Sequence, residues 1–158
     1  MIRIKKVQLA FRKGWVNKSG FDGLYAFFIM IRSWSLFTHV ELKLPNGLSF
    51  SSVDEGVRFK KIKYSHPDRW QFVELDVVKL INPVTKINFN NAQELYDFCK
   101  TIHGDYDWTG IVLYEGLPFG IDDPGKWWCS EVCSYVIGLI KYKINPGELF
   151  NIARKKLN

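Results

Sequence analysis

The pentapeptide Trp127-Trp128-Cys129-Ser130-Glu131 lies at the centre of residues 104–140, around which the rest of the chain can be organised. Cys129 follows a loop rich in glycine and proline and stands at the predicted start of an apolar helix. A thiol at a helix N-terminus lies at the positive end of the helix dipole, which favours the thiolate, the nucleophilic form of cysteine. One interpretation of Cys129 is therefore a catalytic cysteine.

The other interpretation is a buried structural cysteine, because free cysteine is among the residues most often found in protein cores. Cys99 and Cys133 fit that description better than Cys129, since both lie inside predicted helices and away from the dipole end. Taken alone, Cys129 is more often expected to be structural than catalytic.

The composition predicts a single folded domain spanning residues 1–158. Hydrophobic residues make up 47% of the chain and aromatic residues 16%, which argues against disorder. The net charge of +6 permits contact with nucleic acid or anionic lipid. No basic run is long or interleaved with aromatic residues, so solubility is the favoured reason for the charge and no nucleic acid is expected as a partner.

Three cysteines without close-set pairs argue against a disulfide framework and for a reducing compartment. No Cys or His pair at ligand spacing completes a site with Cys129 and Cys133, so neither a metal nor a cofactor is expected. The basic N-terminus does not resemble a secretion signal, and the longest apolar run, residues 24–31, is too short to span a bilayer. The expected location is cytoplasmic or virion-associated.

Hydrophobic periodicity predicts an α+β fold. Alternating patterns predict a first strand within residues 2–11 and an antiparallel meander over residues 37–78, with a strong hairpin signal at Pro45-Asn46-Gly47. Helical spacing, caps and loop residues predict helices, and these cover residues 23–32, 91–102, 108–115, 129–141 and 147–156. Asp107 or Thr109 opens the third helix, and Asn90 or Asn91 caps the second.

His39 lies on the predicted strand 37–44, on the polar face that also carries Glu41. Side chains two apart on a strand point the same way, so Glu41 could hold the imidazole in one tautomer. The alternative is an ordinary surface or core histidine beside an exposed carboxylate. His66 and His103 lie in a polar loop and a helix-ending turn, and both are expected at the surface.

The hairpin offers a second candidate to orient His39. A two-residue turn at Asn46-Gly47 would place Asp54 roughly opposite His39, whereas a three-residue turn would bring Ser51 opposite Glu41. The sequence leaves both registers open.

Three motifs occur in an order that resembles the circularly permuted branch of the NlpC/P60 papain-like superfamily. They are Thr38-His39-Val40-Glu41-Leu42, Gly104-Asp105-Tyr106-Asp107-Trp108 and Trp128-Cys129-Ser130-Glu131, followed by Ile144-Asn145-Pro146-Gly147-Glu148-Leu149. The closest group is the YiiX/YebB-like proteins, and the lecithin:retinol acyltransferase type is more distant. In that branch the His strand precedes the Cys helix, as it does here over residues 36–149.

The resemblance implies a papain-like antiparallel sheet packed against helices, and a thiol peptidase or amidase acting on peptide bonds, with peptidoglycan as the default substrate. Cys129 would be the nucleophile, His39 the general base, and Glu41 or a residue of the next strand the third member. Glu131 and Asp107 match motif positions with orienting or structural roles. The chain departs from the pattern at Glu41, where a glycine is usual.

Two alternatives accompany this hypothesis. The first is a thiol acyltransferase or lipid esterase of the same branch, which an apolar cleft lined by Trp127, Trp128 and the Phe27-Phe28 segment would favour. The second is a binding or virion-associated module, for example from a phage, that keeps the fold without turnover. The sequence does not decide the oligomeric state or the bond cleaved.

Overall fold

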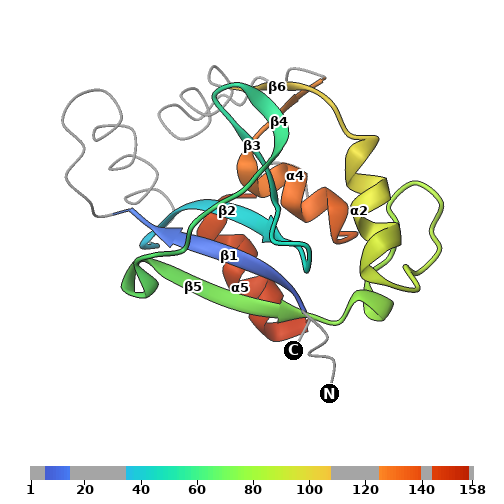
Figure 1. Ribbon diagram of the computed structural model, residues 1–158, viewed down its shortest axis with the longest axis horizontal. Helices are drawn as coiled ribbons and strands as arrows, with labels where there is room; N and C mark the ends of the chain where they lie inside the picture. The colour runs from blue at the N-terminus through green and yellow to red at the C-terminus, as the bar shows by residue number, and fades with distance from the viewer. Residues whose placement is uncertain (1–5, 15–34, 108–124, 140–143, 157–158) are drawn as a thin grey trace.

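The computed structural model describes residues 6–14, 35–107, 125–139 and 144–156. These residues form an α+β fold in which helices pack against a five-stranded antiparallel sheet (Figure 1). The predicted coarse fold class is therefore confirmed. The helices predicted at residues 23–32 and 108–115 lie outside the described residues.

The sheet has the strand order β4-β3-β2-β1-β5, and every neighbouring pair is antiparallel. Its strands are β1 (Val7–Lys13), β2 (Phe37–Lys43), β3 (Ser49–Val53), β4 (Gly56–Lys60) and β5 (Trp70–Leu75). A separate parallel pair joins β6 (Asp105–Tyr106) to β7 (Lys126–Trp127).

The prediction of one meander over residues 37–78 is correct for β2, β3 and β4 but wrong for β5. β5 pairs with β1 on the far side of β2, which places Val73 opposite Leu9 and Leu75 opposite Val7. All four of these side chains are buried, so the long-range pairing completes one apolar face. The free edge of β4 is instead met by the segment before β6, where Val57 N–H donates to the Gly104 carbonyl over 2.9 Å. The predicted last strand also ends at Leu75, and Val77–Lys79 form a 3₁₀ turn, η2, instead.

The β2–β3 hairpin contains a three-residue turn. Leu44 N–H donates to the Leu48 carbonyl over 2.8 Å, and Gly47 has a positive φ of 84° that suits a glycine. The resulting register pairs Leu42 with Phe50, so continuing it brings Ser51, and not Ser52, level with Glu41. The alternative that placed Asp54 opposite His39 is wrong.

Three α-helices belong to the described residues: α2 (Ala92–Lys100), α4 (Cys129–Val136) and α5 (Pro146–Lys156). α2 begins after Asn91, whose side chain accepts from two backbone N–H groups, as predicted. α5 begins at Pro146, and Asn145 Oδ1 accepts from Glu148 N–H over 2.9 Å. None of the described helices is long and apolar enough to cross a membrane.

α4 begins at Cys129, as predicted, but ends before residue 141. Gly138 adopts a positive φ of 77°, and its N–H donates to the Tyr135 carbonyl. Leu139 N–H donates to the Ser134 carbonyl, which completes a Schellman motif. The apolar run of the sequence therefore continues beyond the end of the helix itself.

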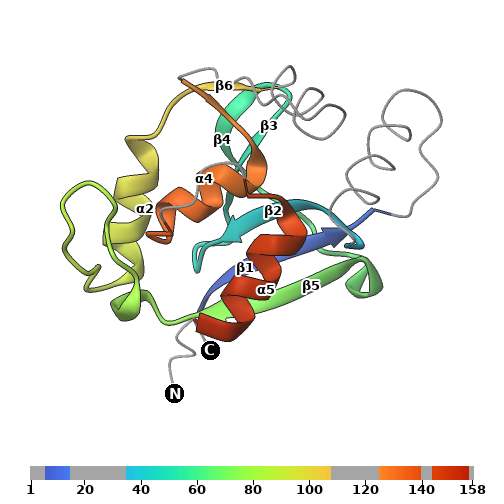
Figure 2. The same ribbon diagram turned by 180° about the vertical axis from the view of Figure 1, so that it is seen from behind.

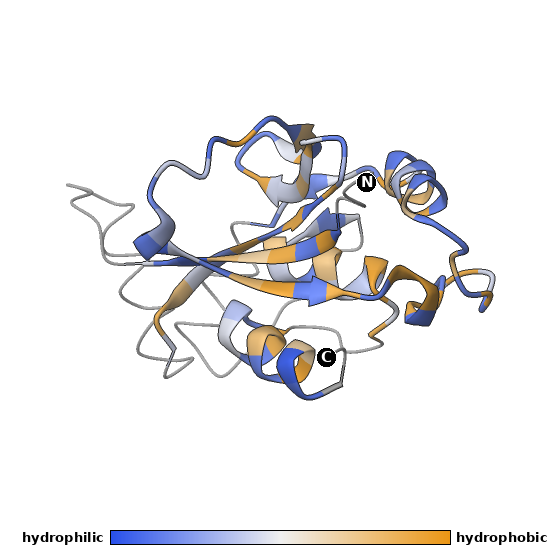
Figure 3. Ribbon diagram, turned by 60° about the horizontal axis from the view of Figure 1, so that its bottom comes forward, coloured by the Kyte–Doolittle hydropathy of each residue, from blue (hydrophilic) through white to orange (hydrophobic). Residues whose placement is uncertain are grey.

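The core lies between the sheet and its helices (Figures 2 and 3). α5 packs across β2 and β5, where Phe150 contacts Phe11 and Phe37 at centroid distances of 5.1 and 4.6 Å. α4 packs against β2 and β3 and buries Val132 completely. The first turn of α4 is thereby held at the upper part of the sheet, near β2 and β3.

Candidate active site

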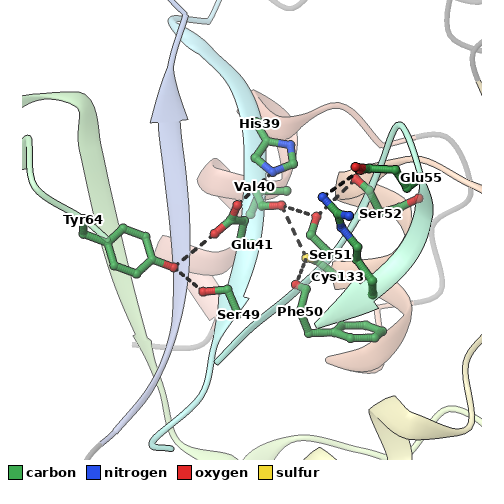
Figure 4. A network of polar contacts seen from close by, with 11 residues as sticks. His39, Val40, Glu41, Ser49, Phe50, Ser51, Ser52, Glu55, Tyr64 and Cys133 are labelled. Atoms are coloured by element: carbon green, nitrogen blue, oxygen red, sulfur yellow. Dashed lines mark hydrogen bonds and ion pairs between the residues drawn. The ribbon is translucent and has the colours of Figure 1, made fainter. Parts of the chain in front are cut away.

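The candidate site lies where β2 and β3 diverge. Their pairing is limited to the two residue pairs next to the hairpin, after which β2 pairs with β1 alone and β3 with β4 alone. The Val40 carbonyl accepts instead from Ser51 Oγ at 2.8 Å and from Cys133 Sγ at 3.8 Å (Figure 4). Cys133 Sγ also lies 3.9 Å from the Phe50 carbonyl oxygen. The second turn of α4 is thus fastened to both diverging strands.

β7 leads directly into α4 and is held against both β3 and β6. Ser52 Oγ donates to the Trp127 carbonyl over 2.8 Å, which ties the residue two before Cys129 to β3. Gly104, at the start of the second sequence motif, packs so closely that a Cβ there would lie 2.4 Å from the Gly125 carbonyl oxygen. The three motifs of the sequence, on β2, β6 and β7–α4, are therefore neighbours in the fold.

The first turn of α4 is stabilised by its own side chains. Glu131 Oε2 accepts from Trp128 N–H over 3.1 Å, the arrangement of the acidic half of a capping box. Ser130 Oγ donates to the Ile144 carbonyl and so connects this turn to the segment before α5. Cys129 is the first residue of the helix and is 5% exposed. In these contacts Glu131 supports the turn that carries the thiol.

His39 lies beside Glu41, as their shared strand face predicts. His39 Nε2 is 3.2 Å from Glu41 Oε1, and the two side chains are 18% and 8% exposed. Burial alone lowers the pKa of His39. The negative charge of Cys129 and a hydrogen bond with it, joined by the hydrogen bond and charge of Glu41, outweigh burial and raise this pKa to about 10. The structure thus brings His39, Glu41 and Cys129 together.

Tyr64 is a member of this cluster that the sequence did not reveal. Tyr64 Oη donates to Glu41 Oε2 over 3.1 Å and lies 2.5 Å from Ser49 Oγ (Figure 4). Burial raises the pKa of Tyr64, and the Glu41 charge adds to this, so its hydroxyl stays protonated. Tyr64 follows β4 in a polar segment without periodicity, which is why no pattern indicated it.

The other two cysteines have the surroundings of structural residues. Cys99 and Cys133 are fully buried. Burial raises the pKa of Cys99 to about 12. Burial also raises the pKa of Cys133 well above its usual value, and the charges of Cys129 and Glu41 add to the effect. Both thiols are therefore held in the protonated, weakly nucleophilic form.

The other residues considered from the sequence lie outside the cluster of His39, Glu41, Cys129 and Tyr64. Asp54 is exposed in the turn after β3, and the hairpin register does not pair it with His39. Asp107 is buried directly after β6, and its N–H donates to the Trp127 carbonyl over 3.4 Å. His66 and His103 are exposed, as predicted.

The chemistry that Cys129 and His39 offer is nucleophilic attack and proton transfer. Among the residues that the structure describes, no group of three or more His, Cys, Asp or Glu side chains is arranged to hold a metal ion. Comparisons with protein-family models, curated proteins and solved structures found no match.

Proposed function

We propose that this chain is a cysteine peptidase or amidase that cleaves amide bonds with Cys129 and His39. The observation that carries the proposal is the surroundings of His39, whose Nε2 lies 3.2 Å from Glu41 Oε1 and whose pKa is raised by the neighbouring Cys129 and Glu41. A raised imidazole pKa beside a thiol at a helix N-terminus supports the proposal of a thiolate–imidazolium pair. The His strand precedes the Cys helix, which supports a circularly permuted papain-like fold of the NlpC/P60 type.

In the first half of the proposed reaction, the Cys129 thiolate attacks the carbonyl carbon of the substrate amide. A sulfur–carbon bond forms, and the carbonyl electron pair moves onto oxygen. Backbone N–H groups in the first turn of α4 point out of the helix N-terminus and donate to this oxyanion. The His39 imidazolium then gives its proton to the leaving nitrogen, the carbon–nitrogen bond breaks, and an acyl-thioester remains on Cys129.

In the second half, neutral His39 takes a proton from a water molecule as the water oxygen attacks the thioester. The carbon–sulfur bond breaks, the carboxylic acid product leaves, and Cys129 is again a thiolate beside a protonated His39. Glu41 contacts Nε2 of the ring and leaves Nδ1 as the nitrogen that can serve Cys129. Glu41 thereby fixes which nitrogen handles the proton.

Peptide bonds of peptidoglycan are the substrate class we propose first, on the basis of the motif resemblance. A transferase or esterase of the same branch would share the acyl-thioester and differ in the acyl donor and acceptor. Peptidoglycan fragments and acyl esters, offered to the same preparation, separate these possibilities. Release of new amino groups from the fragments supports the amidase, whereas acyl turnover alone contradicts it.

The nucleophile can be tested without a substrate. Iodoacetamide labelling across pH 5–10, followed by peptide mapping, compares Cys129 with Cys99 and Cys133 inside one molecule. We expect Cys129 to react fastest at neutral pH and to lose this advantage in His39→Ala. Equal labelling of the three cysteines, unchanged by His39→Ala, would refute the proposed pair.

A further inference from the structure

We propose that Tyr64 is a positioning residue that holds the Glu41 carboxylate against His39, an inference that rests on the proposed function of Cys129 and His39. Tyr64 acts through Glu41 and contacts neither the thiol nor, in the proposed reaction, the substrate. Its hydroxyl and the imidazole bind different oxygens of one carboxylate, Oε2 and Oε1. Both ends of the buried carboxylate are therefore occupied, which leaves Glu41 little freedom to rotate.

The direction of each hydrogen bond in the network of Ser49, Tyr64, Glu41 and His39 follows from the chemistry of the groups. An ionised carboxylate only accepts, so the single hydrogen of the Tyr64 hydroxyl goes to Glu41. Ser49, 2.5 Å away, must then donate its own hydrogen to the Tyr64 oxygen. Ser49 therefore donates to Tyr64, and Tyr64 donates to Glu41. His39 donates to the other oxygen of Glu41. The two hydroxyl groups thus supply one continuous chain of donors to Glu41.

The sheet explains how Tyr64 reaches Glu41. Ala10 on β1 is paired with Glu41 on one side and with Phe72 of β5 on the other, so these three side chains share a face. The Tyr64 ring packs edge-on against Trp70 and Phe72, at centroid distances of 4.9 and 5.4 Å. Its hydroxyl then crosses above β1, where Ala10 is completely buried although it lies on the polar face. A small residue at position 10 leaves the space that the tyrosine occupies.

Other charged or titratable groups near this hydrogen-bond network do not replace Tyr64 as a donor to Glu41. Arg12 is the β1 partner of His39 and lies on the same face of the sheet. The Lys43 ammonium lies over the Tyr64 ring, 5.0 Å from its centroid. Cys133 contributes a buried thiol that is held protonated. In the contacts of the described residues, Glu41 Oε2 receives its hydrogen bond from Tyr64.

Tyr64→Phe removes only this hydroxyl and keeps the ring contacts. Oε2 of the Glu41 carboxylate would then be a buried acceptor without its donor, so the carboxylate would rotate away from His39 or accept a proton more readily. We expect the rate of Cys129 alkylation at pH 7 to fall roughly tenfold, the equivalent of one net hydrogen bond. The acid limb of the alkylation profile should also move to higher pH, which a purely structural role would not cause.

Matched variants make the test specific. Tyr96→Phe serves as the control, because Tyr96 packs on Phe59 of β4 and is not part of the chain of donors. Ser49→Ala should change the profile in the same direction but less, since Tyr64 keeps its own hydrogen for Glu41. Each variant is compared with the parent chain by iodoacetamide labelling at Cys129 and by thermal unfolding.

A double-mutant cycle decides whether Tyr64 acts through Glu41. In a Glu41→Gln background, Tyr64→Phe should change the alkylation rate less than about twofold, because the carboxylate it supports is gone. Full additivity of the two substitutions, or a Tyr64→Phe profile identical to that of Tyr96→Phe, overturns the inference. If His39→Ala still slows alkylation in that case, the proposed function survives. If His39→Ala has no effect, the proposed function fails together with this inference.

Discussion

The two turns of α4 carry one cysteine each, four residues apart, and their surroundings differ sharply. Cys129 begins the helix, at the positive end of the dipole, and helps to raise the pKa of the neighbouring His39. Cys133, one turn later, faces the carbonyl oxygens of Val40 and Phe50. Both thiols are buried. Since both thiols are buried, the groups around them distinguish Cys129 from Cys133: one lies beside a histidine with a raised pKa and the other beside two carbonyl oxygens.

The largest expected effect comes from removing the sulfur in the first turn. Cys129→Ala should reduce amide hydrolysis by about 10⁴-fold or more, because the nucleophile is lost. Cys133→Ala, one turn away, should leave the pH profile of iodoacetamide labelling at Cys129 unchanged. An amide-hydrolysis assay of Cys129→Ala checks the first statement, and peptide mapping of labelled Cys133→Ala checks the second. Persistent hydrolysis by Cys129→Ala would mean that another group performs the chemistry.

The second-largest effect is expected from removing the imidazole of His39, the proposed partner of Cys129. His39→Ala should lower the rate of amide hydrolysis by about 10²- to 10⁴-fold, the usual contribution of a general acid–base group. His103→Ala is the matched control, because His103 is an exposed histidine at the end of the α2 segment. An equal loss of rate in the two variants would point to a general effect on folding, in contradiction to a specific role for His39.

The second turn should matter for stability. Cys133→Ala removes a completely buried side chain and its contacts with two strand carbonyls, so we expect a loss of about 1–3 kcal/mol in the free energy of unfolding. Urea unfolding followed by tryptophan fluorescence measures the change. The matched Cys129→Ala variant should lose less stability. A larger loss of stability in Cys129→Ala than in Cys133→Ala would contradict the assignment of Cys133 to packing.

The smallest effect is expected at the end of α4. Gly138→Ala places a Cβ at a positive φ and 2.4 Å from the Ile81 carbonyl oxygen, so it should destabilise the fold by about 1–2 kcal/mol. Reactivity of Cys129 should be unaffected, since the helix start is unchanged. A denaturation curve indistinguishable from that of the parent chain would contradict the strain expected from a Cβ at this position.

Local patterns in the sequence were sufficient for much of this site. The alternation around His39 predicted that Glu41 shares its face, because strand periodicity depends only on neighbouring residues. The start of α4 at Cys129 and the cap of α2 at Asn91 followed from loop composition and capping preferences. The triad-like grouping of His39 and Cys129 was suggested by motif order, and no periodicity of the sequence contains it.

The β5–β1 pairing, the position of Tyr64 and the end of α4 were not predicted from the sequence, and each has a physical reason. The pairing of β5 with β1 depends on which apolar faces meet in the core, and that is not encoded in the pattern of either strand alone. Tyr64 reaches Glu41 across β1 because of this same pairing, so it could not be anticipated either. Gly138 is a helix-end signal, but the apolar residues that follow it obscured the boundary.

The most direct test of the account is the NMR titration of His39 in the parent chain and in Cys129→Ala. Its pKa should be raised to about 10 in the parent, from an ordinary 6.5, and should fall in the variant, where the charge of Cys129 no longer offsets burial. Because the folded state holds this proton more tightly, the stabilisation is complete below pH 6.5 and is lost as the pH rises through about 10. An ordinary His39 pKa that does not change in Cys129→Ala would contradict the proposed thiolate–imidazolium pair.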